Sequence, residues 1–285
     1  YFTPMLPLFV CEVTLGYMLA YRNCKYAEQL KFTITICGSY NMGKPDIIYE
    51  DNDIIVCCKP AGIATQTRRI GQQDMESFIR NYRAAKNEPP YVGIVHRLDQ
   101  PVEGVMVFAK NQKAAASLSR QIKEHTTEKY YRAASRGHGV SGADKQEDNH
   151  DPAWHTLTDY ISFDKRTNTS KITSEKDRLA KKAVLQYRVI SVTPDRDSSQ
   201  NECIRTEFDI KLLTGRHHQI RLQLAHIGYP LIGDTKYGKP ASNNSGTGSK
   251  SGRTCGGVRE QLALCSYKIV FDHPATGERM TFELP

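Results

Sequence analysis

The sequence lacks the cysteine and histidine spacing that marks a metal site. Its eight cysteines are scattered, no two have the two-residue separation of a zinc knuckle, and no Cys/His cluster has ligand spacing. A glycine-rich loop of the kind that cradles phosphates is also missing. We therefore expect no metal and no cofactor, and we expect reduced thiols that serve as small core residues of a cytoplasmic protein.

Long hydrophobic runs are also scarce. The only apolar candidate for targeting or membrane insertion is residues 1–21, which contain Pro4, Pro7 and Glu12 and have no basic leader. We expect neither a signal peptide nor a membrane span from such a segment. Residues 1–45 hold aromatic residues and three cysteines but no chemistry that we can name, so they are expected to form an N-terminal segment of unknown role.

Positive charge is what the sequence has in excess. The 285 residues carry a formal net charge of +8, with a sequence pI near 9.0, in an otherwise ordinary globular composition. Such an excess suits a partner rich in phosphate or an anionic surface, although many proteins of similar charge bind neither. The length allows one large domain or two smaller ones, and we expect a monomer.

Apolar periodicity predicts an α+β protein with a mixed or antiparallel sheet. Short apolar or alternating runs predict strands over 47–49, 54–57, 102–109, 204–212, 262–271 and 279–284. Helical spacing predicts three helices, over 75–82 after an Asp74 cap, 115–122 after an Asn111 cap, and 220–227 before Gly228. The polar stretches 136–154 and 239–257 are expected to be exposed loops.

The first motif with chemical potential is His96-Arg97-Leu98-Asp99. It follows an apolar run and precedes Gln100-Pro101, which places Asp99 in a loop at a strand end. A four-residue match by itself favours an aspartate that caps a turn or pairs with a nearby cation. Gly104 and the strand that ends at Ala109 follow at a fixed spacing and make the motif more specific.

A second motif, Thr214–Arg221, has the sequence TGRHHQIR and joins the alternating strand to a helix through a glycine turn. Free backbone N–H groups at such a helix start could meet a phosphate. Each of its residues taken singly is commonly structural. A run of eight is far more specific than any of its members.

Together with two further segments, these motifs resemble the RluA family of pseudouridine synthases. Lys59-Pro60-Ala61-Gly62 is similar to a strand end of that family, and Lys129-Tyr130-Tyr131-Arg132-Ala133 to one of its strands. All four motifs occur in the family's order, from about Asp46 to the C-terminus. The resemblance implies a pseudouridine synthase catalytic domain over residues 46–285, with that family's mixed or antiparallel sheet flanked by helices and loops.

The resemblance also implies an activity and a set of residues. The enzyme would flip a specific uridine out of structured ribosomal or transfer RNA and isomerise it to pseudouridine. Asp99 would be the catalytic carboxylate, Tyr131 rather than Tyr130 the active-site tyrosine, and Arg221 the partner of Asp99. RNA contacts would come from Lys59, His96, Arg97, Arg216, His218 and Gln219.

Elementary chemistry fits these roles but leaves alternatives open. A carboxylate can act on a glycosidic bond as a nucleophile or as a base, and both roles require an ionised Asp99. Arg221 could hold it through two parallel hydrogen bonds, and Tyr131 could stack on the base. The ring of Tyr131 could equally be an aromatic core residue, and Arg97 an ordinary phosphate contact.

Two other functions remain open from the sequence. A nucleic-acid glycosidase would also place a carboxylate beside a glycosidic bond, but it would release free uracil. A catalytically silent RNA-binding protein or chaperone could use the same scaffold, although it would have no need of Asp99, Tyr131 and Arg221 together.

Overall fold

The computed structural model of the chain describes residues 32–35, 45–67, 69, 71–136, 153–196, 202–238 and 260–284. The chain divides into two compact units, Tyr1–Phe32 and Thr33–Pro285, and the described residues from Thr33 onward belong to the second. The expected loops at 136–154 and 239–257 lie almost wholly outside the described residues. Most of residues 1–45 also lie outside them, so the role of that segment stays a prediction.

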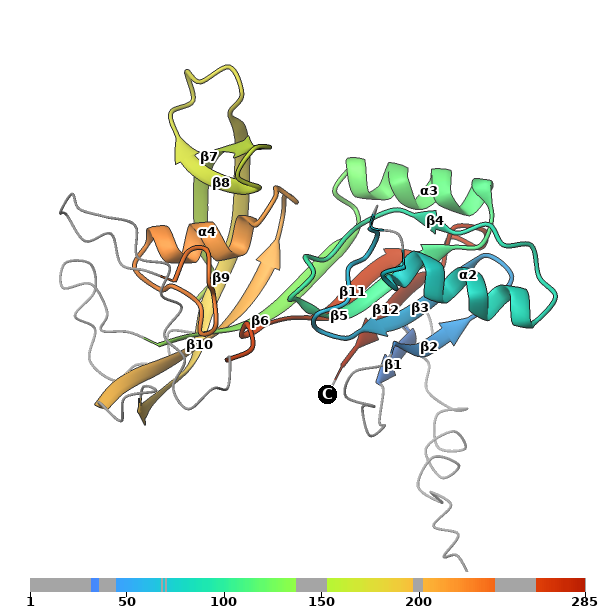
Figure 1. Ribbon diagram of the computed structural model, residues 1–285, viewed down its shortest axis with the longest axis horizontal. Helices are drawn as coiled ribbons and strands as arrows, with labels where there is room; N and C mark the ends of the chain where they lie inside the picture. The colour runs from blue at the N-terminus through green and yellow to red at the C-terminus, as the bar shows by residue number, and fades with distance from the viewer. Residues whose placement is uncertain are drawn as a thin grey trace, which may run out of the picture. The chain divides into compact units, whose positions relative to one another are not determined.

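The described strands form one mixed sheet of twelve, which confirms the α+β class (Figure 1). Their order along the main path is β2-β3-β5-β11-β6-β10-β9-β7-β8, while β4 pairs with β5, and β12 with β1 and β11. Only β5 and β11 are parallel neighbours along this path. The strands are β1 (Phe32–Thr35), β2 (Asp46–Glu50), β3 (Ile54–Lys59), β4 (Gly93–Ile94), β5 (Glu103–Ala109), β6 (Glu128–Arg136), β7 (His155–Asp164), β8 (Thr169–Thr173), β9 (Lys181–Arg196), β10 (Glu202–Leu212), β11 (Leu264–Asp272) and β12 (Arg279–Glu283).

Among the described residues, three helices accompany the sheet, α2 (Met75–Ala85), α3 (Gln112–Lys123) and α4 (Gln219–His226). Both predicted N-caps are confirmed. Asp74 exchanges side-chain and backbone hydrogen bonds with Ser77 in a capping box, and Asn111 Oδ1 accepts from Ala114 N at 2.8 Å. Caps of this kind satisfy orphan N–H groups and stabilise a helix by about 1 kcal/mol.

The buried face of α3 differs from the predicted one. Helical spacing in the sequence predicts an apolar face of Ala115, Leu118 and Ile122. The buried residues are instead Ala114, Leu118 and Gln121. Gln121 is buried because it binds the backbone of Asp272 on β11 through both its amide nitrogen and its oxygen. Hydrophobic periodicity cannot anticipate a buried polar residue that is satisfied in this way.

The core has two layers because β3 and β5 are buried on both faces. Ile55 and Cys57 of β3 belong to the same buried cluster as α2, and their neighbours Ile54, Val56 and Cys58 to the same cluster as α3. Successive side chains of a strand point to opposite faces, so α2 and α3 cover opposite sides of this part of the sheet.

The strands β7, β8 and β9 were not predicted. β7 carries polar side chains on both faces and buries only Ile161 and Ser162, so neither alternation nor an apolar run marks it. The alternation predicted for 204–212 holds only in part, because Ile204 is 44% exposed and burial begins at Thr206.

Two further observations bear on the expectations about membranes and metals. Among the described helices, none is long and apolar enough to cross a membrane. Asp51, Asp53 and His273 bring three potential ligand atoms within 4.8 Å of one another. These groups are already engaged internally, since Asp51 accepts from two backbone amides and pairs with His273 Nε2 at 2.8 Å.

Candidate active site

A cleft of about 1420 Å³ gathers the predicted site residues from segments that are distant in sequence. Its walls come from the loop before Pro101, from β6, and from the turn between β10 and α4. Eight of the nine predicted site residues line it, namely His96, Arg97, Asp99, Tyr131, Arg216, His218, Gln219 and Arg221.

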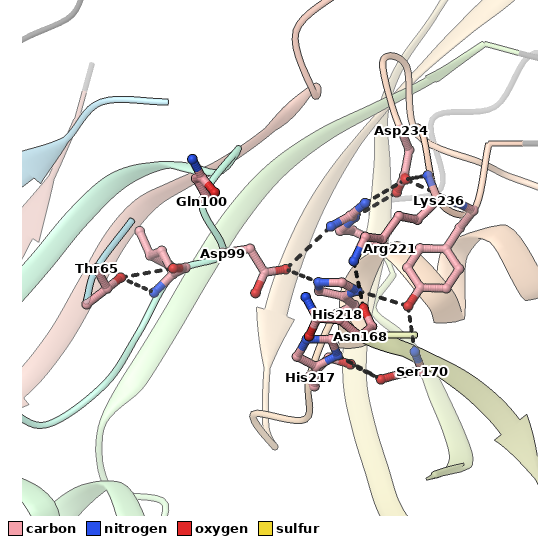
Figure 2. Close-up of polar contacts among 12 residues, drawn as sticks. Thr65, Asp99, Gln100, Asn168, Ser170, His217, His218, Arg221, Asp234 and Lys236 are labelled. Carbon is pink, nitrogen blue, oxygen red and sulfur yellow. Dashed lines mark hydrogen bonds and ion pairs between the residues drawn. The ribbon is translucent and has the colours of Figure 1, made fainter. Parts of the chain in front are cut away.

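The loop that carries Asp99 is anchored on both sides of this residue. Thr65 Oγ1 accepts from Leu98 N at 3.1 Å and donates to Leu98 O at 2.9 Å. On the other side, Gln100 O accepts from Gly62 N at 2.8 Å. Figure 2 shows Asp99 between these anchors and the groups that face its carboxylate. Short backbone bonds of this kind fix the position of the side chain before any ligand arrives.

Lys59 belongs to this anchor, which corrects its predicted role as an RNA contact. Its side chain is fully buried, and Nζ donates to the carbonyl oxygens of Pro60, Ile63 and Gln100 at 3.0, 2.6 and 3.1 Å. All three ammonium donors are thus used inside the fold. Burial lowers the pKa of Lys59 to about 8, against the charge of Asp99, which raises it.

The carboxylate of Asp99 faces two side chains of the second motif (Figure 2). Its Oδ2 lies 3.7 Å from Arg221 Nη1 and 3.6 Å from His218 Nε2, and the side chain is 30% exposed. Burial raises the pKa of Asp99, while Arg221 and then Lys236 oppose that shift. The arrangement keeps a partly desolvated carboxylate beside cations that favour its ionised form.

The predicted two-bond grip of Arg221 on Asp99 is wrong. The guanidinium directs Nε and Nη2 at the two oxygens of Asp234, both at 2.7 Å, and only Nη1 faces Asp99. Asp234 also accepts from the backbone amides of Lys236 and Tyr237. Asp234 therefore orients Arg221 through the planar fork, and the remaining nitrogen serves Asp99.

Tyr131 faces the cleft, whereas Tyr130 does not line it. Neighbouring residues of a strand point to opposite faces, so of these two tyrosines of β6 only Tyr131 lines the cleft. Its side chain is buried, with 5% of the residue's surface exposed. Burial raises the pKa of Tyr131, and the neighbouring Ser266 opposes that shift. The hydroxyl of Tyr130 instead donates to Glu128, outside the residues that line the cleft.

His96 and Gln219 line the cleft, and each also forms hydrogen bonds within the fold. His96 Nε2 accepts from Val107 N at 3.1 Å, whereas Nδ1 is buried without a hydrogen-bond partner among the described residues. Burial lowers the pKa of His96 to about 3. Gln219 Oε1 accepts from Arg216 N and Thr214 Oγ1, and its amide donates to Gln223. Both residues shape the cleft walls, and their contact with RNA stays a prediction.

The cleft has an excess of positive charge. Its lining includes six cationic side chains and two carboxylates. The cations are Arg69, Arg97, Lys123, Lys129, Arg216 and Arg221, and the carboxylates are Glu76 and Asp99. Burial lowers the pKa of Lys129. A cleft of this sign and size attracts a polyanion and can admit a nucleotide.

Comparison with known proteins agrees with this chemistry. The family described as RNA pseudouridylate synthase matches residues 53–226. The chain is 30% identical over 241 residues to ribosomal large subunit pseudouridine synthase D of Neisseria meningitidis serogroup B, covering 84% of this chain and 58% of the relative. It is also 30% identical over 241 residues to tRNA pseudouridine synthase C of Haemophilus ducreyi, covering 83% of this chain and 88% of the relative.

Among solved structures, the human RNA pseudouridylate synthase domain containing 1 has a similar fold. Its TM-score is 0.60 at 23% sequence identity, covering 87% of this chain and 86% of that one. This likeness supports the fold alone. The chain spans little more than half the length of the meningococcal relative.

Proposed function

Because the chain belongs to the RNA pseudouridylate synthase family, we propose that it is an isomerase that converts uridine in a structured RNA to pseudouridine, with Asp99 as the catalytic carboxylate. The observation that carries the proposal is the position of Asp99. It lies on an anchored loop in a basic cleft, with its Oδ2 facing Arg221 and His218. Family membership and site geometry are independent arguments for the same activity.

The reaction breaks the bond between N1 of uracil and C1′ of ribose, turns the base, and forms a bond from C5 to C1′. The proton on C5 is then lost and N1 gains one, so the mass of the RNA does not change. Asp99 assists either as a nucleophile on the sugar or as a base that removes a sugar proton. In both cases the carboxylate must be ionised, which the nearby cations favour.

The substrate must expose its uridine before reaction. Extrusion of a stacked base costs a few kcal/mol, on the order of one or two stacking interactions. The exposed side chain of Arg97 lies on the same loop as Asp99 and lines the cleft, so it can hold the backbone beside the extruded nucleotide. Tyr131 provides an aromatic wall beside Asp99 for the base.

The names of the relatives point to two classes of RNA substrate. One relative is named for the large ribosomal subunit and another for transfer RNA. We propose ribosomal or transfer RNA as substrate and a cytoplasmic site of action. The proposal requires no metal or cofactor, because the carboxylate, the cations and the tyrosine provide the chemistry described above.

The test is to incubate the purified chain with ribosomal and transfer RNA that lack modifications, digest the RNA to nucleosides, and quantify pseudouridine and free uracil. We expect pseudouridine at one or a few positions and no uracil. Release of uracil would identify a glycosidase. If the chain binds both classes of RNA tightly but forms neither pseudouridine nor uracil, the result would favour a catalytically silent RNA-binding protein.

A further inference from the structure

Two donors converge on the same oxygen of Asp99. Arg221 Nη1 and His218 Nε2 both lie on the side of Oδ2, at 3.7 and 3.6 Å. Figure 2 shows the other oxygen of the carboxylate pointing away from both side chains. Catalytic hydrogen bonds are often long in ligand-free proteins and shorten in the reactive complex. Oδ2 is therefore the held oxygen, and Oδ1 is the one presented to the cleft.

A hydrogen bond on the far side of the imidazole sets which nitrogen of His218 carries the proton. His218 Nδ1 lies 2.9 Å from the hydroxyl of Tyr237, which accepts from Ser170 N at 2.8 Å. The hydroxyl's own hydrogen is then available to His218 Nδ1. If Nδ1 carried the proton instead, Nε2 would direct a lone pair at a carboxylate oxygen, which is repulsive. The Nε2–H tautomer satisfies both neighbours.

The surroundings keep this imidazole neutral and fixed. His218 stacks on His217 at 3.7 Å between ring centroids, and His217 in turn contacts the ring of Phe163 at 4.2 Å. Burial and the positive charges of Arg221 and Lys236 lower the pKa of His218 to about 3, with Asp234 opposing them. A neutral donor can hold Oδ2 without giving the carboxylate a proton.

We propose that His218 is a positioning residue, held in its Nε2–H tautomer by Tyr237, which together with Arg221 fixes Oδ2 of Asp99 so that Oδ1 reacts with the ribose. This rests on the proposed function for the identity of the reaction. The tautomer and the hydrogen-bond chain are properties of the free protein.

The first test is ¹⁵N NMR of histidine-labelled protein without RNA. We expect His218 to show a protonated Nε2 and an unprotonated Nδ1, with no titration between pH 5 and 8. Asp99, Arg221, Asp234, Lys236, His217 and Tyr237 all face this ring or its partners. A protonated Nδ1 in the neutral ring, or titration of His218 within that range, would overturn the proposal.

Removing one hydroxyl tests the chain of hydrogen bonds. Tyr237→Phe deletes the group that sets the tautomer, whereas Tyr160→Phe deletes a hydroxyl on β7 that donates to Glu175 outside the residues that line the cleft. We expect Tyr237→Phe to give His218 a mixture of tautomers and a single-turnover rate lowered about tenfold at unchanged RNA affinity. Tyr160→Phe should leave both unchanged. An unaltered tautomer and rate in Tyr237→Phe would refute the role of Tyr237.

A pair of substitutions at His218 separates positioning from packing. His218 has a left-handed backbone, with φ of 54°, so Gln and Leu share the same strain there. Gln keeps an N–H donor and Leu does not. We expect His218→Gln to be at least several-fold faster than His218→Leu in single turnover, and equal rates would overturn the proposal. The wild-type tautomer can be measured even if the protein makes no pseudouridine, so failure of the proposed function is distinguishable from failure of this inference.

Discussion

At the scale of single residues, Arg221 divides its guanidinium between two carboxylates. Two nitrogens are bound to Asp234, and one faces Asp99. Arg221→Lys keeps the charge but loses the planar fork. We expect a single-turnover rate lowered by tenfold or more, which corresponds to about 1.4 kcal/mol for each tenfold, and little change in RNA affinity. Rapid-quench rates measured beside dissociation constants check this. A lysine variant with the wild-type rate would contradict the role of Arg221 at Asp99.

The pKa of Asp99 gives a second prediction at this scale. Burial raises it, and the charge of Lys236 lowers it. The carboxylate must be ionised, so the rate falls as the pH decreases through this pKa. Lys236→Met removes an opposing cation and should shift the acid limb of the pH–rate profile to higher pH. Lys176→Met makes the same charge change at an exposed position and should not shift it. Superimposable profiles for Lys236→Met and Lys176→Met would contradict the electrostatic account.

At the scale of elements, Gly104 allows β5 and β11 to pair closely. Its φ is +131°, and a Cβ there would lie 2.2 Å from Ser266 O. Gly104→Ala should therefore separate the parallel pair, and we expect a loss of at least 2–3 kcal/mol in the free energy of unfolding, roughly the range of severe backbone mutations. Urea denaturation measures it. Gly62→Ala is the control, because its positive φ adds strain while its Cβ meets nothing within 4 Å. Equal losses in the two variants would contradict the contact argument.

The sequence was informative where elements are apolar or motifs are contiguous. Periodicity predicted the strands β2, β3 and β5 and the caps of α2 and α3. The resemblance predicted that Asp99, Tyr131 and Arg221 belong to one site, and all three line the cleft. The strands β7 and β8 were not predicted, because they contain few apolar side chains. β9 was missed although Leu185, Tyr187 and Val189 alternate with polar residues, a pattern that marks a strand.

No role was predicted for the supporting residues of the site. Asp234, Tyr237 and Ser170 reach it from the loop after α4 and from β8. Only tertiary structure brings them together. Lys59 was assigned to RNA because a motif does not distinguish a side chain that contacts a ligand from one that braces the loop.

At the scale of the whole molecule, the net charge of +8 coincides with a cationic cleft. Each phosphate that Lys or Arg neutralises releases counterions, so we expect the logarithm of the RNA association constant to fall linearly with the logarithm of the salt concentration. Filter-binding or anisotropy titrations between about 50 and 200 mM salt measure the slope. Arg97→Gln should reduce it, because this exposed cation lines the cleft. A flat response would show that the basic surface does not serve RNA.

The most direct measurement compares pseudouridine formation by the wild-type chain with that by Asp99→Asn, on an RNA that the wild type modifies. Asparagine preserves the shape of the side chain but can act neither as an ionised nucleophile nor as a base. We expect Asp99→Asn to fold and to bind this RNA with nearly wild-type affinity while forming no detectable pseudouridine under single-turnover conditions. Pseudouridine formed by Asp99→Asn at a rate comparable to that of the wild type would contradict the assignment of Asp99 as the catalytic carboxylate.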